Sequence, residues 1–168
     1  GFRLDAVRYL IETGGGSDQA DTKATHRLLQ EYSAFMKKRN PQAVFVGEAW
    51  TRIEDAAKYY GDRNELDTIF NFDLASAIIN GVKSGKANPV KIAAMRTRNS
   101  YPDWATDAPF LANHDMPRVT SQIGRNQHKL KSAAAILMTM PGAPFLYYGE
   151  EIGMKGGKPD PNIRTPMQ

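Results

Sequence analysis

Short apolar runs alternate along the chain with longer stretches in which apolar residues recur every three or four positions. A short apolar run between turn residues is typical of a buried strand, and the longer spacing is typical of an amphipathic helix. The apolar runs predict strands at residues 1–7, 43–50, 67–74, 108–115 and 143–151. The helical spacing predicts helices at residues 25–38, 53–60, 75–82, 90–98 and 127–140. This alternation predicts repeated β/α units, a parallel sheet and therefore an α/β fold.

Three acidic residues lie at or just beyond the carboxyl ends of three of these predicted strands: Asp5, Glu48 and Asp115. In a parallel α/β barrel the active site is assembled at that edge, and a doubly wound sheet also binds its ligand there. The glycine-rich segment "TGGGSDQAD" lacks the Gly-Lys-Ser/Thr that a phosphate loop needs, so we interpret it as a flexible loop. The carboxylates therefore become the candidate chemistry.

Other reaction chemistries find little support in the sequence. The three histidines show no zinc-ligand spacing, and no Gly-x-Ser-x-Gly motif marks a serine hydrolase, so no metal site is expected within this chain. Two carboxyl groups that face each other across a pocket are what the hydrolysis of a glycosidic bond requires. One carboxyl group is ionised and attacks or stabilises the sugar cation. The other is protonated and donates its proton to the leaving oxygen.

Composition and charge narrow the range of partners. The chain is 41% hydrophobic and 24% charged, with no apolar stretch long enough to span a membrane, so we expect neither membrane insertion nor disorder. The net charge is +4, but basic and acidic residues are mixed, and the densest basic cluster, residues 37–39, ends a predicted helix. We therefore expect no nucleic-acid partner. The absence of cysteine excludes disulfides and thiolate metal sites but leaves the cellular compartment undetermined.

The first predicted strand, "GFRLDAVRYL", carries two opposite charges. Strand alternation places Arg3, Asp5 and Val7 on one face, which we expect to line the barrel near its mouth. Arg3 should keep Asp5 ionised by its positive charge. Glu48 follows an apolar strand, which should raise its pKa, and it has no such neighbour in its own strand, so we expect it to hold its proton.

Several segments resemble the α-amylase family, glycoside hydrolase family 13. "GFRLDAVRYL", "FVGEAW" and "FLANHDMPR" resemble, in order and spacing, three of the family's short conserved regions. "GAPFLYYGEEIGM" resembles the eighth barrel strand, and "RTPMQ" a stretch that follows it in many members. The resemblance extends over nearly the whole chain. It implies a (β/α)8 TIM barrel, of which residues 1–168 would be one partial catalytic domain with strands 4 to 8 and no second domain.

The resemblance also implies roles for individual residues. Asp5 matches the nucleophile that forms a covalent glycosyl intermediate, Glu48 the general acid/base, and Asp115 the aspartate that binds sugar hydroxyls and favours the distorted ring. Arg3 matches the arginine beside the nucleophile, and His114 a histidine that binds the same sugar. Each also has a structural interpretation: Arg3 and Asp5 as a buried ion pair, Asp115 as a turn cap and His114 as a core histidine.

Further sugar contacts are less directly implied. Arg8 and Tyr9 lie where the family often contacts sugar on the leaving-group side, although the usual Lys-His or Arg-His pair is replaced here. Trp50 is a candidate for stacking on a sugar ring, with simple packing as the alternative interpretation. In the family the residue after the nucleophile tends to differ with linkage, and Ala6 favours α-1,4 over α-1,6 bonds.

We therefore expect a retaining α-glycosidase acting on α-glucans, starch or maltooligosaccharides. The alternatives are an α-1,6-glucosidase, a transglycosylase or trehalose-forming relative, as "IRTPMQ" also suggests, or a non-catalytic family member used for binding. The family's earlier strands are absent, so we interpret the chain as part of a longer protein that alone would be inactive or poorly folded, because an open sheet edge exposes unpaired groups. The inserted domain that usually brings most calcium ligands is absent too, which leaves calcium as an expectation for the complete protein only.

Overall fold

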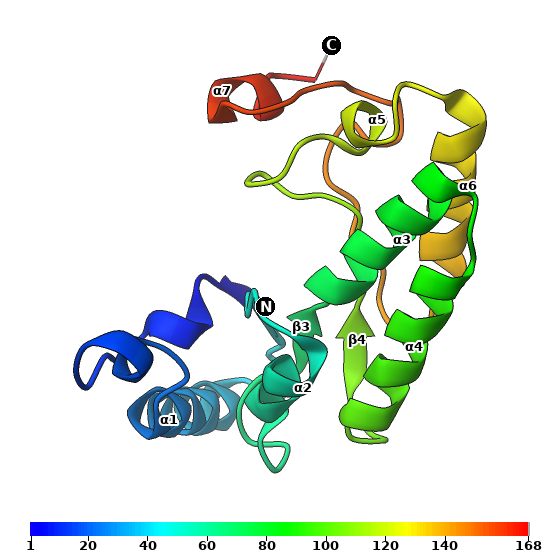
Figure 1. Ribbon diagram of the computed structural model, residues 1–168. Helices are drawn as coiled ribbons and strands as arrows, with labels where there is room; N and C mark the ends of the chain where they lie inside the picture. Colours follow the sequence, from blue (N-terminus) through cyan, green and yellow to red (C-terminus); the bar gives the residue numbers. More distant parts are fainter. Residues whose placement is uncertain (168) are drawn as a thin grey trace. The chain divides into compact units, whose positions relative to one another are not determined.

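The fold, described for residues 1–167 by a computed structural model, is built around a parallel four-stranded sheet with the order β1-β2-β3-β4 (Figure 1). The strands are β1 (Phe2–Leu4), β2 (Phe45–Gly47), β3 (Thr68–Phe70) and β4 (Thr106–Ala108). Consecutive strands are neighbours and all pairs are parallel, so the predicted α/β fold with a parallel sheet is confirmed. In the β1–β2 pair, Leu4 lies opposite Gly47.

Helices separate the strands, as the sequence pattern predicts. The α-helices are α1 (Lys23–Arg39), α2 (Ile53–Ala56), α3 (Phe72–Ser84), α4 (Asn88–Ser100), α5 (Val119–Gln122), α6 (Gln127–Thr139) and α7 (Asp160–Ile163). Short 3-10 helices are η1 (Val7–Tyr9), η2 (Gly16–Gln19) and η3 (Ala57–Tyr60). The longer predicted helices are found within a few residues of their expected bounds. None of the helices among the described residues is long and apolar enough to cross a membrane.

Contacts divide the chain into two compact units, each described by itself. The first comprises Gly1–Phe70 and Thr97–Ala108, and the second comprises Asn71–Arg96 and Pro109–Gln168. The whole sheet and α1 belong to the first unit, and α3 and α6 belong to the second.

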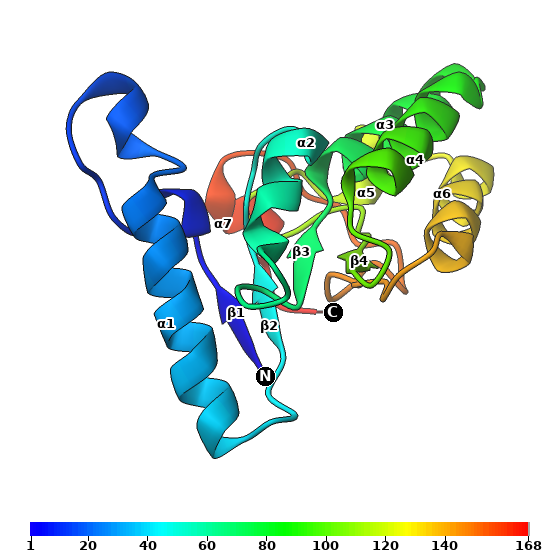
Figure 2. The same cartoon turned by 90° about the horizontal axis from the view of Figure 1, so that it is seen from below.

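In the first unit, α1 packs beside β1 and β2 (Figure 2). Its N-terminus is capped by the Thr22 hydroxyl, which accepts a hydrogen bond from the Thr25 amide at 3.1 Å, and its last turn carries three cations that complement the helix dipole. Tyr32 meets Phe45 of β2 edge to face at 5.1 Å between ring centroids. Burial of these rings fixes the helix against the sheet.

In the second unit, α3 packs against α6. Both helices have buried apolar residues, among them Leu74, Ala75 and Ile78 on α3 and Ala133 and Leu137 on α6. An apolar face of three-to-four spacing is therefore matched by an apolar face on the partner helix, as amphipathic helices require.

The strands are shorter than the apolar runs that predict them. The third run was expected to remain extended to residue 74, but the Asn71 side chain accepts a hydrogen bond from the Leu74 amide at 2.9 Å and starts α3. The fourth was expected at residues 108–115, but the strand ends at Ala108 because Pro109 has no amide hydrogen for the ladder. Phe110 and Leu111 are nevertheless buried.

The fifth predicted strand, residues 143–151, is wrong: the structure forms no strand there. The Phe145 amide donates to the Pro109 carbonyl at 2.8 Å, which is the kind of bond that begins a ladder. Pro144 lacks an amide hydrogen, however, and a turn starts at Tyr148, so too little extended backbone remains for regular pairing. A continuous apolar run indicates burial more reliably than it indicates hydrogen-bonded pairing.

Candidate active site

Asp5 and Glu48 are each the first residue after a strand, β1 and β2 respectively. The two backbones stay joined beyond the strands, since the Glu48 amide donates to the Leu4 carbonyl at 2.9 Å and the Val7 amide donates to the Glu48 carbonyl at 3.1 Å. Parallel pairing in register therefore brings two carboxyl groups from distant parts of the sequence to the same edge. Their predicted position just beyond the strands is confirmed.

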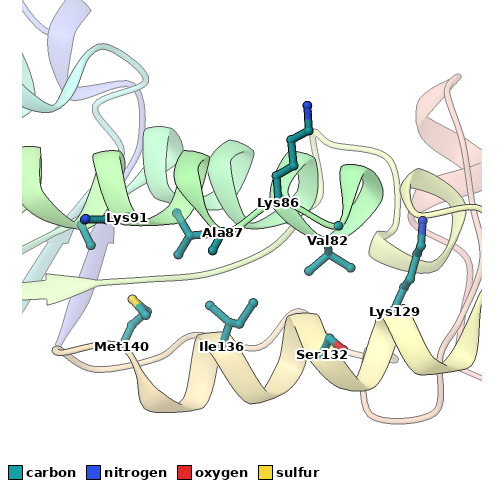
Figure 3. Close-up of a pocket in the computed structure, with 12 residues that line it drawn as sticks. Val82, Lys86, Ala87, Lys91, Lys129, Ser132, Ile136 and Met140 are labelled. Atoms are coloured by element: carbon teal, nitrogen blue, oxygen red, sulfur yellow. The ribbon is translucent and has the colours of Figure 1, made fainter.

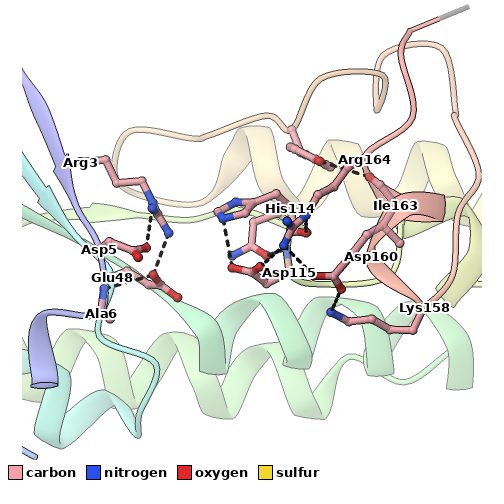
Figure 4. Close-up of polar contacts among 12 residues, drawn as sticks. Arg3, Asp5, Ala6, Glu48, His114, Asp115, Lys158, Asp160, Ile163 and Arg164 are labelled. Carbon is pink, nitrogen blue, oxygen red and sulfur yellow. Dashed lines mark hydrogen bonds and ion pairs between the residues drawn. The ribbon is translucent and has the colours of Figure 1, made fainter.

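Arg3, in the middle of β1, binds both carboxyl groups (Figure 4). One terminal nitrogen lies 2.7 Å from Oδ1 of Asp5, and the other lies 2.7 Å from Oε2 of Glu48. The expected pair of Arg3 with Asp5 is confirmed. Glu48 has no cationic neighbour in its own strand, as expected, but the β1–β2 register places the guanidinium of Arg3 against it from the adjacent strand.

Burial distinguishes the two carboxyl groups. The Asp5 side chain is 73% exposed, whereas that of Glu48 is 11% exposed. Burial, together with hydrogen bonding to Asp5, raises the pKa of Glu48, as the sequence predicts. The Ala6 amide, 3.3 Å from Oε2, and the charge of Arg3 act in the opposite direction and do not cancel the effect. Glu48 is thus the group that retains a proton more readily.

Ala6, two residues after the end of β1, has a left-handed backbone, at φ 44° and ψ 44°. This conformation costs a residue with a side chain roughly 1–2 kcal/mol, and such strain tends to collect at functional sites. The turn sends Val7 into the core, where it is fully buried, while Asp5 remains exposed. The predicted alternation therefore fails after Leu4, and Val7 does not share a face with Asp5.

His114 and Asp115 belong to the second compact unit and lie in a turn (Figure 4). The two side chains contact each other, with Nε2 of His114 at 3.1 Å from Oδ2 of Asp115. Arg164 binds the same turn twice: its NH2 donates to Oδ1 of Asp115 at 2.7 Å and its Nε donates to the His114 carbonyl at 2.8 Å. The turn is capped by the Asn113 side chain, which accepts from the Asp115 amide, and the Asp115 carboxylate is engaged with Arg164 and His114.

Arg164 was not identified from the sequence. It is also bound to Asp160 at 2.8 Å, and Asp160 in turn pairs with Lys158. The residue lies in the "RTPMQ" segment, whose resemblance to the family gives no role to this arginine. An isolated arginine in a polar segment has no periodicity or spacing that would indicate its partner, so only the fold reveals this contact.

Arg8 is held in a network of its own. Its guanidinium forms two hydrogen bonds with Asp21, at 3.0 and 2.6 Å, and donates to the Trp50 carbonyl at 3.0 Å. The Tyr59 hydroxyl also donates to Asp21 at 2.6 Å, and these bonds, that of Arg8 foremost, lower the pKa of the Asp21 carboxyl. Tyr9 and Trp50 are both 51% exposed. Arg8 therefore positions the backbone at Trp50, a role that sequence reasoning missed.

The structure brings the predicted residues together in two groups. The first unit holds Arg3, Asp5 and Glu48, with Arg8 linked to Trp50 through that residue's carbonyl, and the second unit holds His114 next to Asp115. Among residues 1–167, no cluster of three or more His, Cys, Asp or Glu side chains could hold a metal ion. Calcium therefore stays an expectation for the complete protein only.

The fold and the first of these groups define a class of protein. It is the class of α/β proteins that carry a buried and an exposed carboxyl group side by side at the carboxyl edge of a parallel sheet, the arrangement that glycoside hydrolases use. Comparison with known families makes the assignment specific. Residues 1–167 match the α-amylase catalytic domain, and the chain belongs to the α-amylase family.

Individual relatives agree with this assignment. Alpha-amylase 3 of Dictyoglomus thermophilum is 36% identical over 171 residues, which cover 100% of this chain and 32% of the relative. Neopullulanase 2 of Thermoactinomyces vulgaris is 31% identical over 173 residues, covering 99% of this chain and 28% of the relative. The crystal structure of α-amylase from H. orenii superposes with a TM-score of 0.86 at 34% identity, covering 100% of this chain and 34% of that one. The chain thus spans about a third of the length of these relatives.

Proposed function

We propose that the chain supplies strands 4 to 8 of a (β/α)8 catalytic barrel in an enzyme that hydrolyses α-glucans with retention of configuration. Residues 143–151 form no regular strand here, and we propose that they pair as the eighth strand only when the barrel is completed. Asp5 is the nucleophile, Glu48 the general acid/base and Asp115 the carboxylate that binds sugar hydroxyls, with His114 as a second ligand of the same sugar. Arg3 holds Asp5 ionised. The names of the relatives, an α-amylase and a neopullulanase, support the substrate class.

The observation that carries the proposal is that Asp5 and Glu48 both form ion pairs with the guanidinium of Arg3. A retaining glycosidase needs its two carboxyl groups only about 5–5.5 Å apart, whereas an inverting enzyme needs a wider gap that admits a water molecule. Two carboxyl groups bound to the same Arg3 side chain, and hydrogen-bonded to one another, favour the narrow separation. This supports a covalent intermediate on Asp5.

The difference in burial supports the division of roles. In the first step a carboxylate oxygen of Asp5 forms a bond to the anomeric carbon while Glu48 gives its proton to the departing glycosidic oxygen. In the second step the Glu48 carboxylate takes a proton from water, and the water oxygen displaces Asp5. The raised pKa of Glu48 suits it to hold a proton in the first step, and the exposed Asp5 is suited to ionise.

On the leaving-group side the structure favours aromatic contacts. The donors of Arg8 are engaged with Asp21 and the Trp50 carbonyl, so we propose that Tyr9 and Trp50 supply the sugar contact and that Arg8 orients them. The preference for α-1,4 bonds rests on Ala6 and is part of the proposal. Calcium enters no step of this mechanism.

The test is a pair of experiments on a protein in which the chain is completed by the first half of the barrel. Incubation with a slow fluorinated glucosyl substrate should add one glucosyl mass to the peptide that contains Asp5. Glu48→Gln should lower kcat on maltooligosaccharides by about 10²–10⁴-fold, the usual contribution of general acid–base catalysis.

Inverted product would disprove the retaining assignment, and a label on another residue would disprove the assignment of Asp5 as the nucleophile. A Glu48→Gln variant that keeps both turnover and glucan affinity would disprove the catalytic assignment, and a wild-type protein that binds glucan without turnover would identify a non-catalytic family member. We also expect the 168-residue chain alone to hydrolyse no glucan, so robust turnover by the isolated chain would contradict the partial-barrel proposal.

A further inference from the structure

An apolar groove lies between α3, α4 and α6 in the second compact unit (Figure 3). Its volume is about 540 Å³, within the range of small-molecule sites. Val82 of α3 and Ile136 of α6 point toward each other across it, and Val90 and Met140 extend the apolar lining. None of the twelve lining residues is acidic or aromatic.

Three lysines, Lys86, Lys91 and Lys129, stand around this groove. The Lys129 ammonium donates to the Lys83 carbonyl at 2.7 Å. Within residues 1–167, the ammonium groups of Lys86 and Lys91 form no ion pair, and Figure 3 shows Lys86 directed away from the apolar lining. Long lysine stems can cover apolar surface while the charged end stays in water, so these groups can reach a ligand that fills the groove.

The sequence shows that this positive charge is part of a larger asymmetry. Residues 74–102 and 116–149 contain nine of the chain's 22 Lys and Arg and none of its 18 Asp and Glu. The remaining residues hold thirteen basic and eighteen acidic side chains, so the modest net charge of +4 conceals a basic region and an acidic remainder. The groove lies inside the basic region. The positive charge of this region favours a negatively charged ligand in the groove.

We propose that this groove binds a single-chain anionic amphiphile, with a medium-length alkyl chain against Val82, Val90, Ile136 and Met140 and a carboxylate among the lysines. A stable protein partner needs roughly 20–30 residues a side, more than this groove offers. The groove lining and the helices around it, α4 and α6, contain no Trp or Tyr that would mark a membrane-facing surface or a sugar-stacking platform. The proposal is independent of the glycosidase chemistry and needs no catalytic activity for its test.

The first experiment is titration calorimetry of the protein completed by the first half of the barrel, with hexanoate, octanoate and decanoate below their micelle concentrations. Binding should be one to one, and each added methylene should lower Kd roughly fourfold, as burial of a methylene predicts. The octyltrimethylammonium cation, with a similar tail and the opposite charge, should bind at least tenfold more weakly than octanoate.

Substitutions locate the site. The double variant Lys86→Glu with Lys91→Glu should raise the Kd for decanoate at least tenfold, and Ala87→Phe, which fills the groove, should abolish binding. The matched controls place the same changes on exposed positions of α1: Lys23→Glu with Lys38→Glu, and Ala34→Phe. Circular dichroism of each variant verifies that helix content is retained before binding is measured.

The proposal is overturned if decanoate binds all variants equally, because the site is then elsewhere, or if the cationic amphiphile binds as well as the anionic one. Binding to phosphatidylglycerol vesicles without binding to monomeric decanoate would also overturn it and would assign the basic face to a membrane surface. Loss of decanoate affinity in the groove variants alone confirms it.

Discussion

Glu150 gives the fold of the second unit a built-in dependence on pH. Burial raises the pKa of its carboxyl from 4.5 to about 7. The Tyr147 amide, 3.4 Å from Oε2, and the charge of Arg118 favour the ionised form and offset only part of this effect. The folded state therefore prefers the neutral acid over a range of pH in which an unfolded chain would carry a carboxylate.

The sign and size of the effect follow from linkage. Because the folded pKa lies above the unfolded one, the contribution of Glu150 to stability is fully present below pH 4.5 and is lost as the pH rises through 7. The difference between the two pKa values corresponds to about 3 kcal/mol. Glu150→Gln keeps the shape of the side chain and cannot ionise. Relative to the unsubstituted chain it should therefore gain up to about 3 kcal/mol between pH 4.5 and pH 8.5.

The assay is urea unfolding of the protein completed by the first half of the barrel, followed by far-ultraviolet circular dichroism at intervals between these pH values. The relevant quantity is the difference in unfolding free energy between variant and wild type, because titrations of all other groups cancel in it. Glu12→Gln, at an exposed position of the first unit, is the matched control and should show a flat difference. Parallel curves for the Glu150→Gln variant and wild type would refute the reasoning.

Three further predictions concern single contacts in the fold. Gly47→Ala places a Cβ atom in steric conflict with Cδ1 of the buried Leu66 and should destabilise the protein by about 1–3 kcal/mol in urea unfolding. Asn71→Ala removes the cap of α3 and should cost about 1 kcal/mol, measured in the same way. Asp21→Asn keeps a residue that tolerates the left-handed backbone found there, at φ 57°, but removes the carboxylate bound by Arg8. It should cost about 1–2 kcal/mol at pH 7, since this pair is partly exposed.

Each of these predictions has its own check. Gly15→Ala, where an added Cβ would meet nothing within 4 Å, should be tolerated, so equal losses at both glycines would disprove the steric argument. Asn71→Ser should restore much of what Asn71→Ala loses, because serine also caps helices. For Asp21, the lowered pKa of the carboxyl means that its contribution declines as the pH falls below 3.8, so a loss that does not diminish at all between pH 4 and pH 2 would contradict the ionic origin.

The sequence contains enough information to place the two carboxyl groups of the first unit. Asp5 and Glu48 follow short apolar runs, and in a parallel sheet such positions must share an edge, whatever the exact strand length. The elevated pKa of Glu48 could be predicted for the same reason, because the residue emerges from a buried strand. Strand bounds could not be predicted as well, since Pro109 and the cap at Asn71 end pairing while burial continues.

Contacts between side chains that are far apart in the sequence were beyond prediction. The ion pair between Arg3 and Glu48 depends on the register of β1 against β2. The hydrophobic pattern of the sequence does not specify that register when both faces of a strand are apolar. The partners of Arg8 and Arg164 depend on the paths of irregular loops. For charged residues in loops, sequence identifies the candidates, and only the fold assigns their partners.

Because Arg3 binds both Asp5 and Glu48, the two carboxyl groups lie close together and titrate as a coupled pair. Loss of a proton from either carboxyl changes the electric field at the other, so the protons leave in two steps that belong to the pair and cannot each be assigned to one residue. Replacing Asp5 with Asn removes a negative charge that raises the pKa of Glu48, and the surviving glutamic acid then ionises at a lower pH. A pH–rate profile of any single-site variant here therefore describes a different acid from the one in the intact pair.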